Sequence, residues 1–82
     1  MRLTELECVR LTRPLQGEDC YNGRHISVPA GESATVVSVF GDAYEVEFLL
    51  RDGRGCAYSA VLTAREEDVE PCAGSDGHFL PA

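Results

Sequence analysis

The sequence contains no lysine and no tryptophan, and its only basic residues are seven arginines. Fourteen aspartates and glutamates outnumber them, which gives a net charge of −7. Proteins bind the phosphates of nucleic acids through surplus positive charge, so this imbalance argues against a nucleic-acid partner. An acidic chain is attracted to basic surfaces, and the sequence therefore predicts a protein partner with a basic surface.

Long apolar runs are also missing. A membrane-spanning helix needs about 18 or more consecutive apolar residues, and no stretch of this chain approaches that length. The first residues, Met-Arg-Leu-Thr-Glu-Leu-Glu, carry acids where a signal peptide would have its apolar segment. The sequence therefore predicts a cytoplasmic protein without a membrane segment. Its 82 residues are enough for one small domain with a thin core.

The four cysteines, Cys8, Cys20, Cys56 and Cys72, form no Cys-x-x-Cys pair. Because their wide spacing supplies no local chelate, the sequence predicts no metal site and no cofactor. Two disulfides with three possible pairings are conceivable, but without an export signal reduced thiols are expected. At least two of the cysteines are then expected to be buried as small apolar side chains. A cysteine-based metal-binding or redox-linked domain remains the alternative interpretation.

Catalytic motifs are absent as well. Cys20 and His25 form the only thiol–imidazole pair that is close in sequence, and both lie in an irregular segment. A base has to stay within hydrogen-bond distance of its nucleophile, and nothing in this segment predicts such rigidity. The sequence therefore predicts a protein that is not an enzyme.

The clearest positive feature is the alternation in Tyr44-Glu45-Val46-Glu47-Phe48. Tyr44, Val46 and Phe48 share one face of a strand, and Glu45 and Glu47 share the other. One apolar and one polar face are typical of antiparallel sheets. The two glutamates are therefore predicted to lie on a solvated outer face.

Four further segments have strand patterns, so that five short strands are predicted at residues 7–13, 33–40, 44–48, 56–62 and 68–70. Residues 15–30 are predicted to be irregular, with a short edge segment at 25–29. The adjacent Val36 and Val37 favour a bulge or burial on both sides. Thr63 is predicted to cap a single 3₁₀ turn over residues 64–67. The domain is predicted to cover residues 1–71, and a flexible tail residues 72–82.

Short strands joined by tight turns predict an all-β fold, a small SH3-like barrel of about five antiparallel strands with one 3₁₀ turn. Strand alternation predicts a buried set of apolar residues on one face, with two residues at its margin, Val39 and Tyr44. The predicted buried set is Val9, Leu11, Val37, Val46, Phe48 and Leu62.

The order and spacing of several short motifs resemble the small bacterial family catalogued as domain of unknown function 4926. The resemblance covers roughly residues 6–71 and rests on Cys8-Val9-Arg10-Leu11, Val28-Pro29-Ala30-Gly31, Thr35-Val36-Val37, Tyr44-Glu45-Val46-Glu47-Phe48, Asp52-Gly53, and Leu62 before an acidic turn ending in Val69. Ala34 departs from the pattern, where a glycine is expected. The resemblance implies an SH3-like barrel and carries no assigned activity. Barrels of this shape often bind proteins, which is an expectation by analogy of fold.

The predicted partner-binding residues are Tyr21, Arg24 and His25 in the first loop and Glu45 and Glu47 on the outer strand face. Tyrosine and arginine are common interface anchors, and the glutamates suit a basic partner. The sequence thus predicts a small acidic, non-enzymatic protein-interaction module, an inhibitor or accessory subunit of a basic partner protein.

Overall fold

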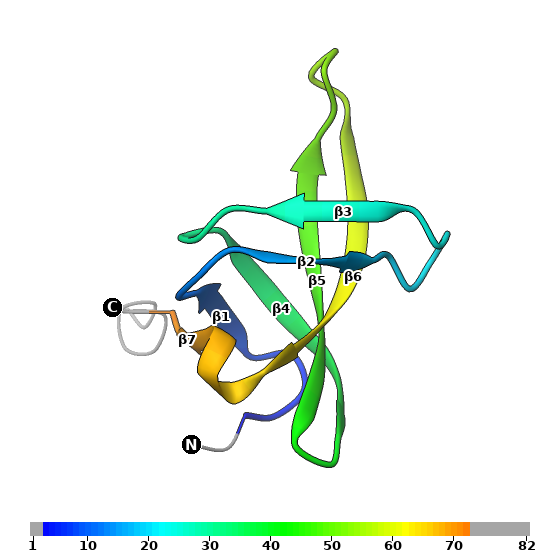
Figure 1. Ribbon diagram of the computed structural model, residues 1–82. Coiled ribbons are helices and arrows are strands. Elements are labelled where there is room, and N and C mark those ends of the chain that lie inside the picture. Colours follow the sequence, from blue (N-terminus) through cyan, green and yellow to red (C-terminus); the bar gives the residue numbers. More distant parts are fainter. Residues whose placement is uncertain (1–2, 73–82) are drawn as a thin grey trace.

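The computed structural model describes residues 3–72, and over these the chain folds as an all-β domain (Figure 1). The elements, in chain order, are β1 (Cys8–Leu11), β2 (Leu15–Glu18), β3 (His25–Val28), β4 (Ser33–Phe40), β5 (Ala43–Arg51), β6 (Ala57–Arg65), the 3₁₀ turn η1 (Glu66–Asp68) and β7 (Val69–Pro71). The predicted all-β class is confirmed. The described residues hold seven strands instead of about five, because the segment predicted to be irregular contains the hairpin β2–β3.

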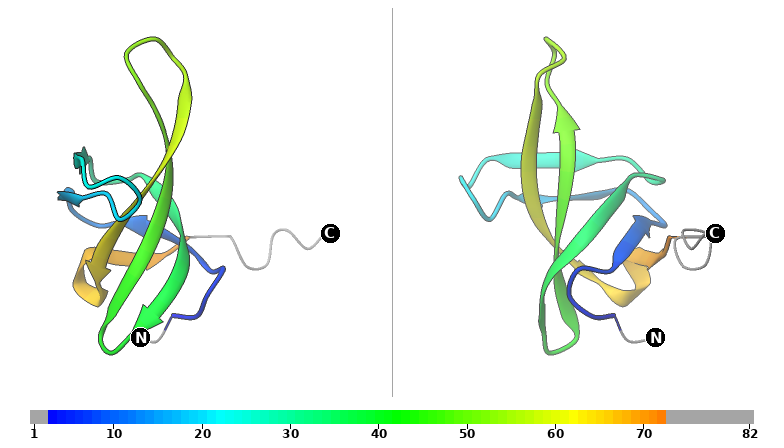
Figure 2. Two further views of the ribbon diagram at one scale, coloured as in Figure 1. Left: turned by 90° about the vertical axis from the view of Figure 1, so that its right-hand side faces the viewer. Right: turned by 180° about the vertical axis from the view of Figure 1, so that it is seen from behind.

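The strands form two antiparallel sheets. The larger one has the order β6-β5-β4-β1-β7, and β2 and β3 make a separate pair. Figure 2 shows the β2–β3 pair lying across one side of β5 and β6, so that the core is enclosed between the two sheets. The β5–β6 hairpin is longer than the other elements and projects beyond β3 (Figure 1).

A β-bulge in β4 decides which valine enters the core. Val36 pairs with Val46, the register then shifts between Val36 and Ser38, and both paired valines have no exposed surface. Val37 is the additional residue and is only half-buried. The predicted bulge is confirmed, but the prediction that Val37 lies in the core is wrong, because the bulge turns Val36 inward instead.

The remaining core follows the predicted alternation closely. Val9, Leu11, Val46, Phe48 and Leu62 are all buried, as predicted. Further members of the same cluster are Leu3, Val28, Ala34, Val36, Tyr44, Ala64 and Val69. Tyr44 is more deeply buried than a marginal position, since only 4% of its surface is exposed, whereas 37% of Val39 is exposed.

Two of the predicted turns depend on glycine. Gly31 (φ 94°) precedes β4 and Gly41 (φ 60°) lies between β4 and β5. Glycine adopts positive φ without the steric penalty that a Cβ atom brings. The chain reverses direction at both places, as the sequence predicts.

The 3₁₀ turn begins two residues later than the sequence predicts. Thr63 is not its cap, because β6 continues to Arg65 and the turn starts at Glu66. The Asp68 carboxylate instead accepts a hydrogen bond from the backbone N–H of Arg65 at 2.9 Å. Long-range pairing with β5 extends the strand through residues that resemble a helix start in sequence.

A disulfide joins Cys8 in β1 to Cys72, which follows β7, with a Cα–Cα distance of 5.6 Å. The pairing of Val9 with Pro71 places the two cysteines opposite each other, at a separation that a disulfide spans easily. The expectation of reduced thiols is therefore wrong for this pair, and Cys72 belongs to the folded domain. Cys20 and Cys56 are free but exposed, so neither is a buried apolar side chain. Residues 73–82 of the predicted tail lie outside the described residues.

Candidate functional site

The loop between β2 and β3 is held by Asp19, of which only 1% is exposed. Its backbone N–H donates to the carbonyl of Arg24 at 2.8 Å, and its own carbonyl accepts from Gly23 at 2.7 Å. Asn22 and Gly23 complete the turn, with Gly23 at φ 74°. These bonds make the loop a compact turn that closes the β2–β3 hairpin.

Asp19 also fastens this turn to the edge of β6. Its Oδ1 accepts hydrogen bonds from the backbone N–H groups of Val61 at 2.9 Å and Tyr21 at 3.0 Å. The backbone N–H of Cys20 donates to the carbonyl of Val61 at 2.8 Å. One side chain and one peptide group thus continue the strand pairing where β2 ends. The side chains of Cys20 and Tyr21 are thereby directed toward the outer face of β5.

These side chains meet the two predicted glutamates. The phenol of Tyr21 donates to Glu47 Oε2 at 3.1 Å, and the thiol of Cys20 donates to Glu45 Oε2 at 3.6 Å. We call Cys20, Tyr21, Glu45 and Glu47 the acidic face. Both glutamates lie on the outer side of β5, as predicted, but they are half-buried because the loop partly covers them.

No arginine neutralises the acidic face within the described residues. The ion pairs in that part of the chain join Arg10 to Glu70, Arg13 to Asp68 and Arg65 to Asp42. From residues 3–72, Glu45 and Glu47 accept side-chain hydrogen bonds only from neutral groups, the Cys20 thiol and the Tyr21 phenol. Their charges are therefore available to a cation that comes from another molecule.

The glutamates also change the acidity of their neighbours. The hydrogen bond to Glu47 and then its negative charge raise the pKa of Tyr21, because both oppose formation of a phenolate. Burial and then the charge of Glu45 raise the pKa of the Cys20 thiol. The acidic face thus keeps the Tyr21 phenol and the Cys20 thiol protonated to higher pH.

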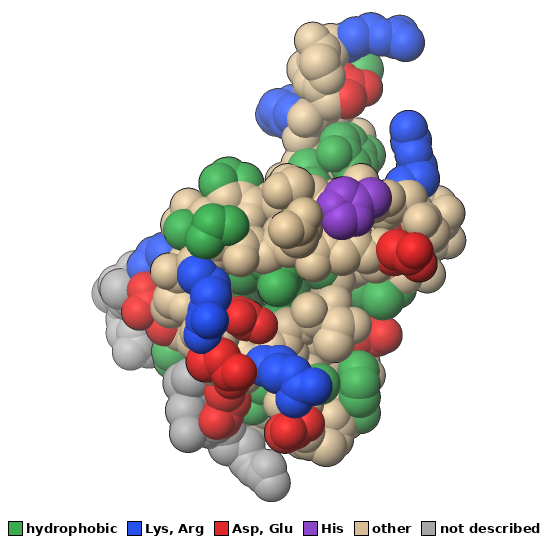
Figure 3. All heavy atoms as spheres, in the orientation of Figure 1, with side chains coloured by type: hydrophobic (Ala, Val, Ile, Leu, Met, Phe, Trp, Pro, Cys, Tyr) green, Lys and Arg blue, Asp and Glu red, His purple; other side chains and the backbone are tan. Residues whose placement is uncertain are grey.

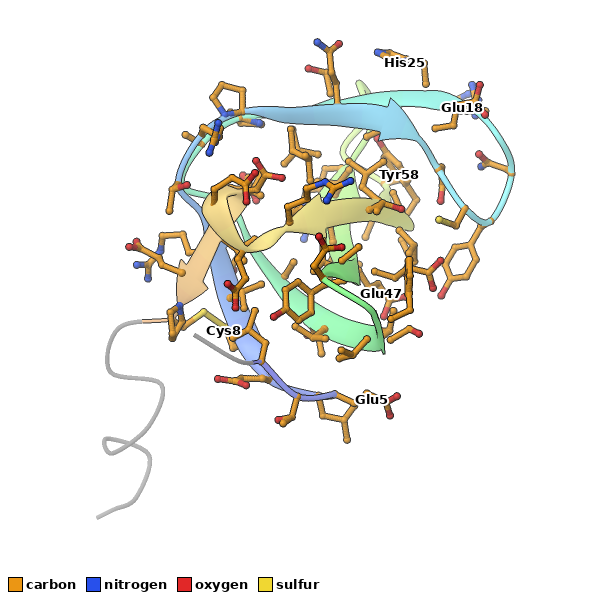
Figure 4. All side chains as sticks on the ribbon, turned by 60° about the horizontal axis from the view of Figure 1, so that its bottom comes forward. Glu5, Cys8, Glu18, His25, Glu47 and Tyr58 are labelled. Atoms are coloured by element: carbon orange, nitrogen blue, oxygen red, sulfur yellow. A yellow bond between two sulfur atoms is a disulfide. The ribbon has the colours of Figure 1, made fainter. Side chains whose placement is uncertain are left out.

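The other two predicted binding residues, Arg24 and His25, lie elsewhere. His25 Nε2 is 3.1 Å from Gln16 Oε1 on the neighbouring strand. Both residues line a hollow of about 480 Å³ whose opposite wall includes Tyr58 of β6. Figure 4 shows His25 and Glu47 at separate places, with Tyr58 nearer to the hairpin that carries His25. The predicted site is therefore divided into two surfaces.

A second hollow, of about 310 Å³, adjoins the acidic face. Glu47 is at its border, together with Thr35, Ser33 and Ser59 from the neighbouring strands and Leu49, which is 71% exposed. A carboxylate beside small hydroxyl side chains and an exposed leucine can receive a basic side chain with an apolar stem. Lysine and arginine both have this character.

The structure does not assemble the thiol–imidazole pair considered from the sequence. The hydrogen-bond partner of the Cys20 thiol is Glu45, and that of His25 is Gln16. A raised thiol pKa is also the opposite of what activates a cysteine nucleophile. Among residues 3–72 there is no cluster of three or more His, Cys, Asp or Glu side chains placed to hold a metal ion.

Sequence reasoning missed Asp19 and Tyr58. The Asn22-Gly23 pair was a signal for a tight hairpin turn, and a hairpin there would have placed Asp19 at a strand end. Tyr58 lies on the same face of β6 as the buried Ala60 and Leu62, but the hairpin extends past the core and leaves it 39% exposed. How far the β5–β6 hairpin extends beyond the core depends on how the two sheets pack, and a local sequence pattern does not predict that packing.

Comparisons of the chain with protein-family models, with curated proteins and with solved structures found no match. In the part of the chain that the structure describes, no helix has the length and apolar character needed to cross a membrane.

Proposed function

We propose that this chain is a non-enzymatic protein-interaction module that binds a basic partner protein through its acidic face. The observation that carries the proposal is the pair Glu45 and Glu47, side by side on β5 without an arginine partner among residues 3–72. Tyr21 stands beside them with 63% of its surface exposed and supplies an aromatic contact. Tyrosine is among the residue types most often found as an anchor at protein interfaces.

As its scaffold we propose an SH3-like barrel similar to domain of unknown function 4926, and the order of the elements supports the barrel part of this proposal. A first strand is followed by a hairpin excursion, three consecutive antiparallel strands, a 3₁₀ turn and a last strand that returns to the first. Barrels of this shape often bind proteins through their loops, which is an argument by analogy of fold. Here that excursion carries Tyr21, and an inhibitor or accessory subunit of a basic protein would use this surface.

The test begins with capture of partners from native lysate on the immobilised protein at about 0.15 M salt, where exposed charges beyond roughly 8 Å are screened. We expect a basic protein to be recovered. The double variant Glu45→Gln/Glu47→Gln should weaken its binding at least about tenfold. Repeated recovery of RNA or DNA in place of protein would contradict the proposal.

The control removes the same charge elsewhere. Glu5 and Glu18 are exposed, form no side-chain ion pair or hydrogen bond within residues 3–72, and lie away from Glu47 in Figure 4. Glu5→Gln/Glu18→Gln should leave partner binding within about twofold, apart from the small effect of net charge on association rate. Equal losses in the two double variants would show that only net charge matters, and the acidic face would lose its role.

A second candidate function, a redox-linked domain, is favoured by the Cys8–Cys72 disulfide. Disulfides persist in oxidising compartments and are rare in the reducing cytoplasm. We propose a cytoplasmic location for the interaction module, whereas a redox-linked domain would need a compartment in which this disulfide can form. Equilibration of the protein with glutathione buffers decides between them: a Cys8–Cys72 bond that opens and closes within the cellular range of potentials supports the redox-linked domain, and a bond that resists reduction supports a structural disulfide in the interaction module.

A further inference from the structure

The strand β3 has an open edge. It pairs with β2 on one side only. The hydrogen bond from Asp19 to Arg24 marks the end of this pairing, and because bonded and non-bonded pairs alternate, His25 and Ser27 direct their N–H and C=O groups away from β2. Within residues 3–72 no backbone hydrogen bond reaches those outward groups. An exposed edge of this kind is a template for another strand.

The projecting β5–β6 hairpin lies beside this open edge and provides a surface next to it. Figures 1 and 2 show β3 crossing the hairpin, which continues beyond it. Two hollows of about 480 and 490 Å³ border β3, one near its start and one near its end. Tyr58 lines both, and its register partner Leu50 lines the second. The two hollows share Tyr58, and we refer to them together as the groove along β3, whose lining includes Tyr58 and Leu50.

The charge of this region is opposite to that of the rest of the molecule. Arg10, Arg13 and Arg65 are each paired with a carboxylate, whereas Arg24, Arg51 and Arg54 lie around the groove and at the hairpin tip with no carboxylate partner among residues 3–72. Figure 3 shows basic side chains outnumbering acidic ones at the upper end, and the two kinds mixed at the lower end.

Two acids, Glu32 and Asp52, line the groove against these three arginines. Asp52 Oδ1 already accepts hydrogen bonds from the backbone N–H groups of Arg54 at 2.8 Å and Cys56 at 2.9 Å. Its charge is therefore directed to the turn. The groove is the one place in the described residues where unpaired arginines gather, on a chain of net charge −7.

We infer that this groove is a second interaction surface, which binds an extended acidic segment of another protein as a strand added to β3. The outward groups of His25 and Ser27 would pair with the backbone of the segment. Its alternate side chains would pack on Tyr58 and Leu50, and its carboxylates would meet Arg24 and Arg51. This inference goes beyond the acidic face and does not depend on it.

The test uses a synthetic nine-residue peptide of alternating aspartate and valine, blocked at both ends, titrated into the ¹⁵N-labelled full chain. We expect saturable shifts of the His25 and Ser27 amide signals and slower hydrogen exchange at both. A peptide with lysine in place of aspartate should bind at least about tenfold more weakly, a difference of roughly 1.4 kcal/mol. Added salt should weaken binding of the acidic peptide.

Ser27 offers a matched pair of variants. Ser27→Pro removes the outward N–H and leaves the pairing with β2 intact, a position where an edge strand tolerates proline. It should reduce affinity at least about tenfold, whereas Ser27→Ala, which keeps the N–H, should bind like the wild type. Arg24→Gln/Arg51→Gln should weaken binding about threefold to tenfold without touching the backbone. Far-UV circular dichroism checks that each variant is folded.

Several results would overturn the inference. One is the absence of saturable shifts at about 1 mM peptide, and another is equal affinity for the lysine peptide. Unchanged affinity in both folded Ser27→Pro and the double arginine variant would also contradict it. Concentration-dependent shifts of His25 and Ser27 without peptide, with a dimer mass in sedimentation, would assign the edge to a second copy. Glu45→Gln/Glu47→Gln should bind the peptide normally, so failure of one surface leaves the other testable.

Discussion

The two ends of the β5–β6 hairpin differ sharply although they are built from the same two strands. At the lower end Phe48 pairs with Ala60, and neither has exposed surface. At the upper end every residue from 51 to 59 is exposed. Within residues 3–72 the arginines follow the same division, being paired with carboxylates in the body of the domain and unpaired beside the groove. Buried apolar contacts are thus concentrated at one end, and the unpaired arginines of residues 3–72 are concentrated at the other.

The largest test of this division uses neighbouring residues of β5. Phe48→Ala should cost about 3–5 kcal/mol, the usual range for truncating a buried phenylalanine. A small domain holds about 5 kcal/mol in total, so most molecules should unfold. Leu49→Ala, one residue away on the outer face, should change the free energy of unfolding by about 0.5 kcal/mol or less. Urea denaturation of both variants measures the difference, and equal losses would contradict the assigned strand face.

The disulfide should be the next largest contribution to the lower end. Cys8 and Cys72 are 64 residues apart in sequence, and closing a loop of that size restricts the unfolded chain by about 2–4 kcal/mol. Cys8→Ser/Cys72→Ser should lose that amount in denaturant unfolding, and reductant should reproduce the loss in the wild type. Cys20→Ser/Cys56→Ser provides the control, with a change of about 0.5 kcal/mol or less. Insensitivity of the wild type to reductant would show that the disulfide contributes nothing.

A smaller loss is expected where β2 meets β6. Asp19→Ala removes the acceptor for two backbone N–H groups and leaves the buried one of Val61 unpaired, at a cost of about 2–3 kcal/mol. Asp19→Asn keeps an oxygen at that position and should remain within about 1 kcal/mol of the wild type. Chemical denaturation compares the two. If Asp19→Ala were as stable as Asp19→Asn, the hydrogen bonds of the Asp19 carboxylate to Val61 and Tyr21 would not contribute to the free energy of unfolding.

The sequence predicts much of the lower end and little of the upper end. Alternation in β5 identifies Val46, Phe48 and both glutamates because one face of that strand is buried and the other is not. The bulge at Val37 makes one core prediction wrong. A single additional residue changes which side chains face the core, so Val36 is buried instead of Val37. The Cys8–Cys72 bond depends on the pairing of β1 with β7, which are far apart in sequence.

The sequence predicts the individual residues of the candidate site but not how they are arranged, because they come from different elements. Glu45 and Glu47 were found through alternation, and Tyr21 through its residue type alone. Their contact needs Asp19 to bind the edge of β6, and a buried aspartate cannot be distinguished in sequence from the acids around it. Arg24 and His25 were grouped with Tyr21 by nearness in sequence, but the turn at Gly23 sends them to the other side of the hairpin.

The smallest expected effect is a change in the pKa of Tyr21. Its titration tests whether Tyr21 belongs to the acidic face or to the groove. The Tyr21 pKa is raised by the hydrogen bond and charge of Glu47, so the folded state holds the phenolic proton more tightly than the unfolded state. Its stabilising contribution is complete below the ordinary tyrosine pKa of about 10 and is lost as pH rises through the folded-state value. Glu47→Gln should therefore lower the Tyr21 midpoint, followed by the ¹³Cζ signal of labelled tyrosine. Arg24→Gln, across the hairpin turn, should leave it unchanged. A midpoint that moved with Arg24 and not with Glu47 would mean that Tyr21 faces the groove, and the two surfaces would have to be redrawn as one.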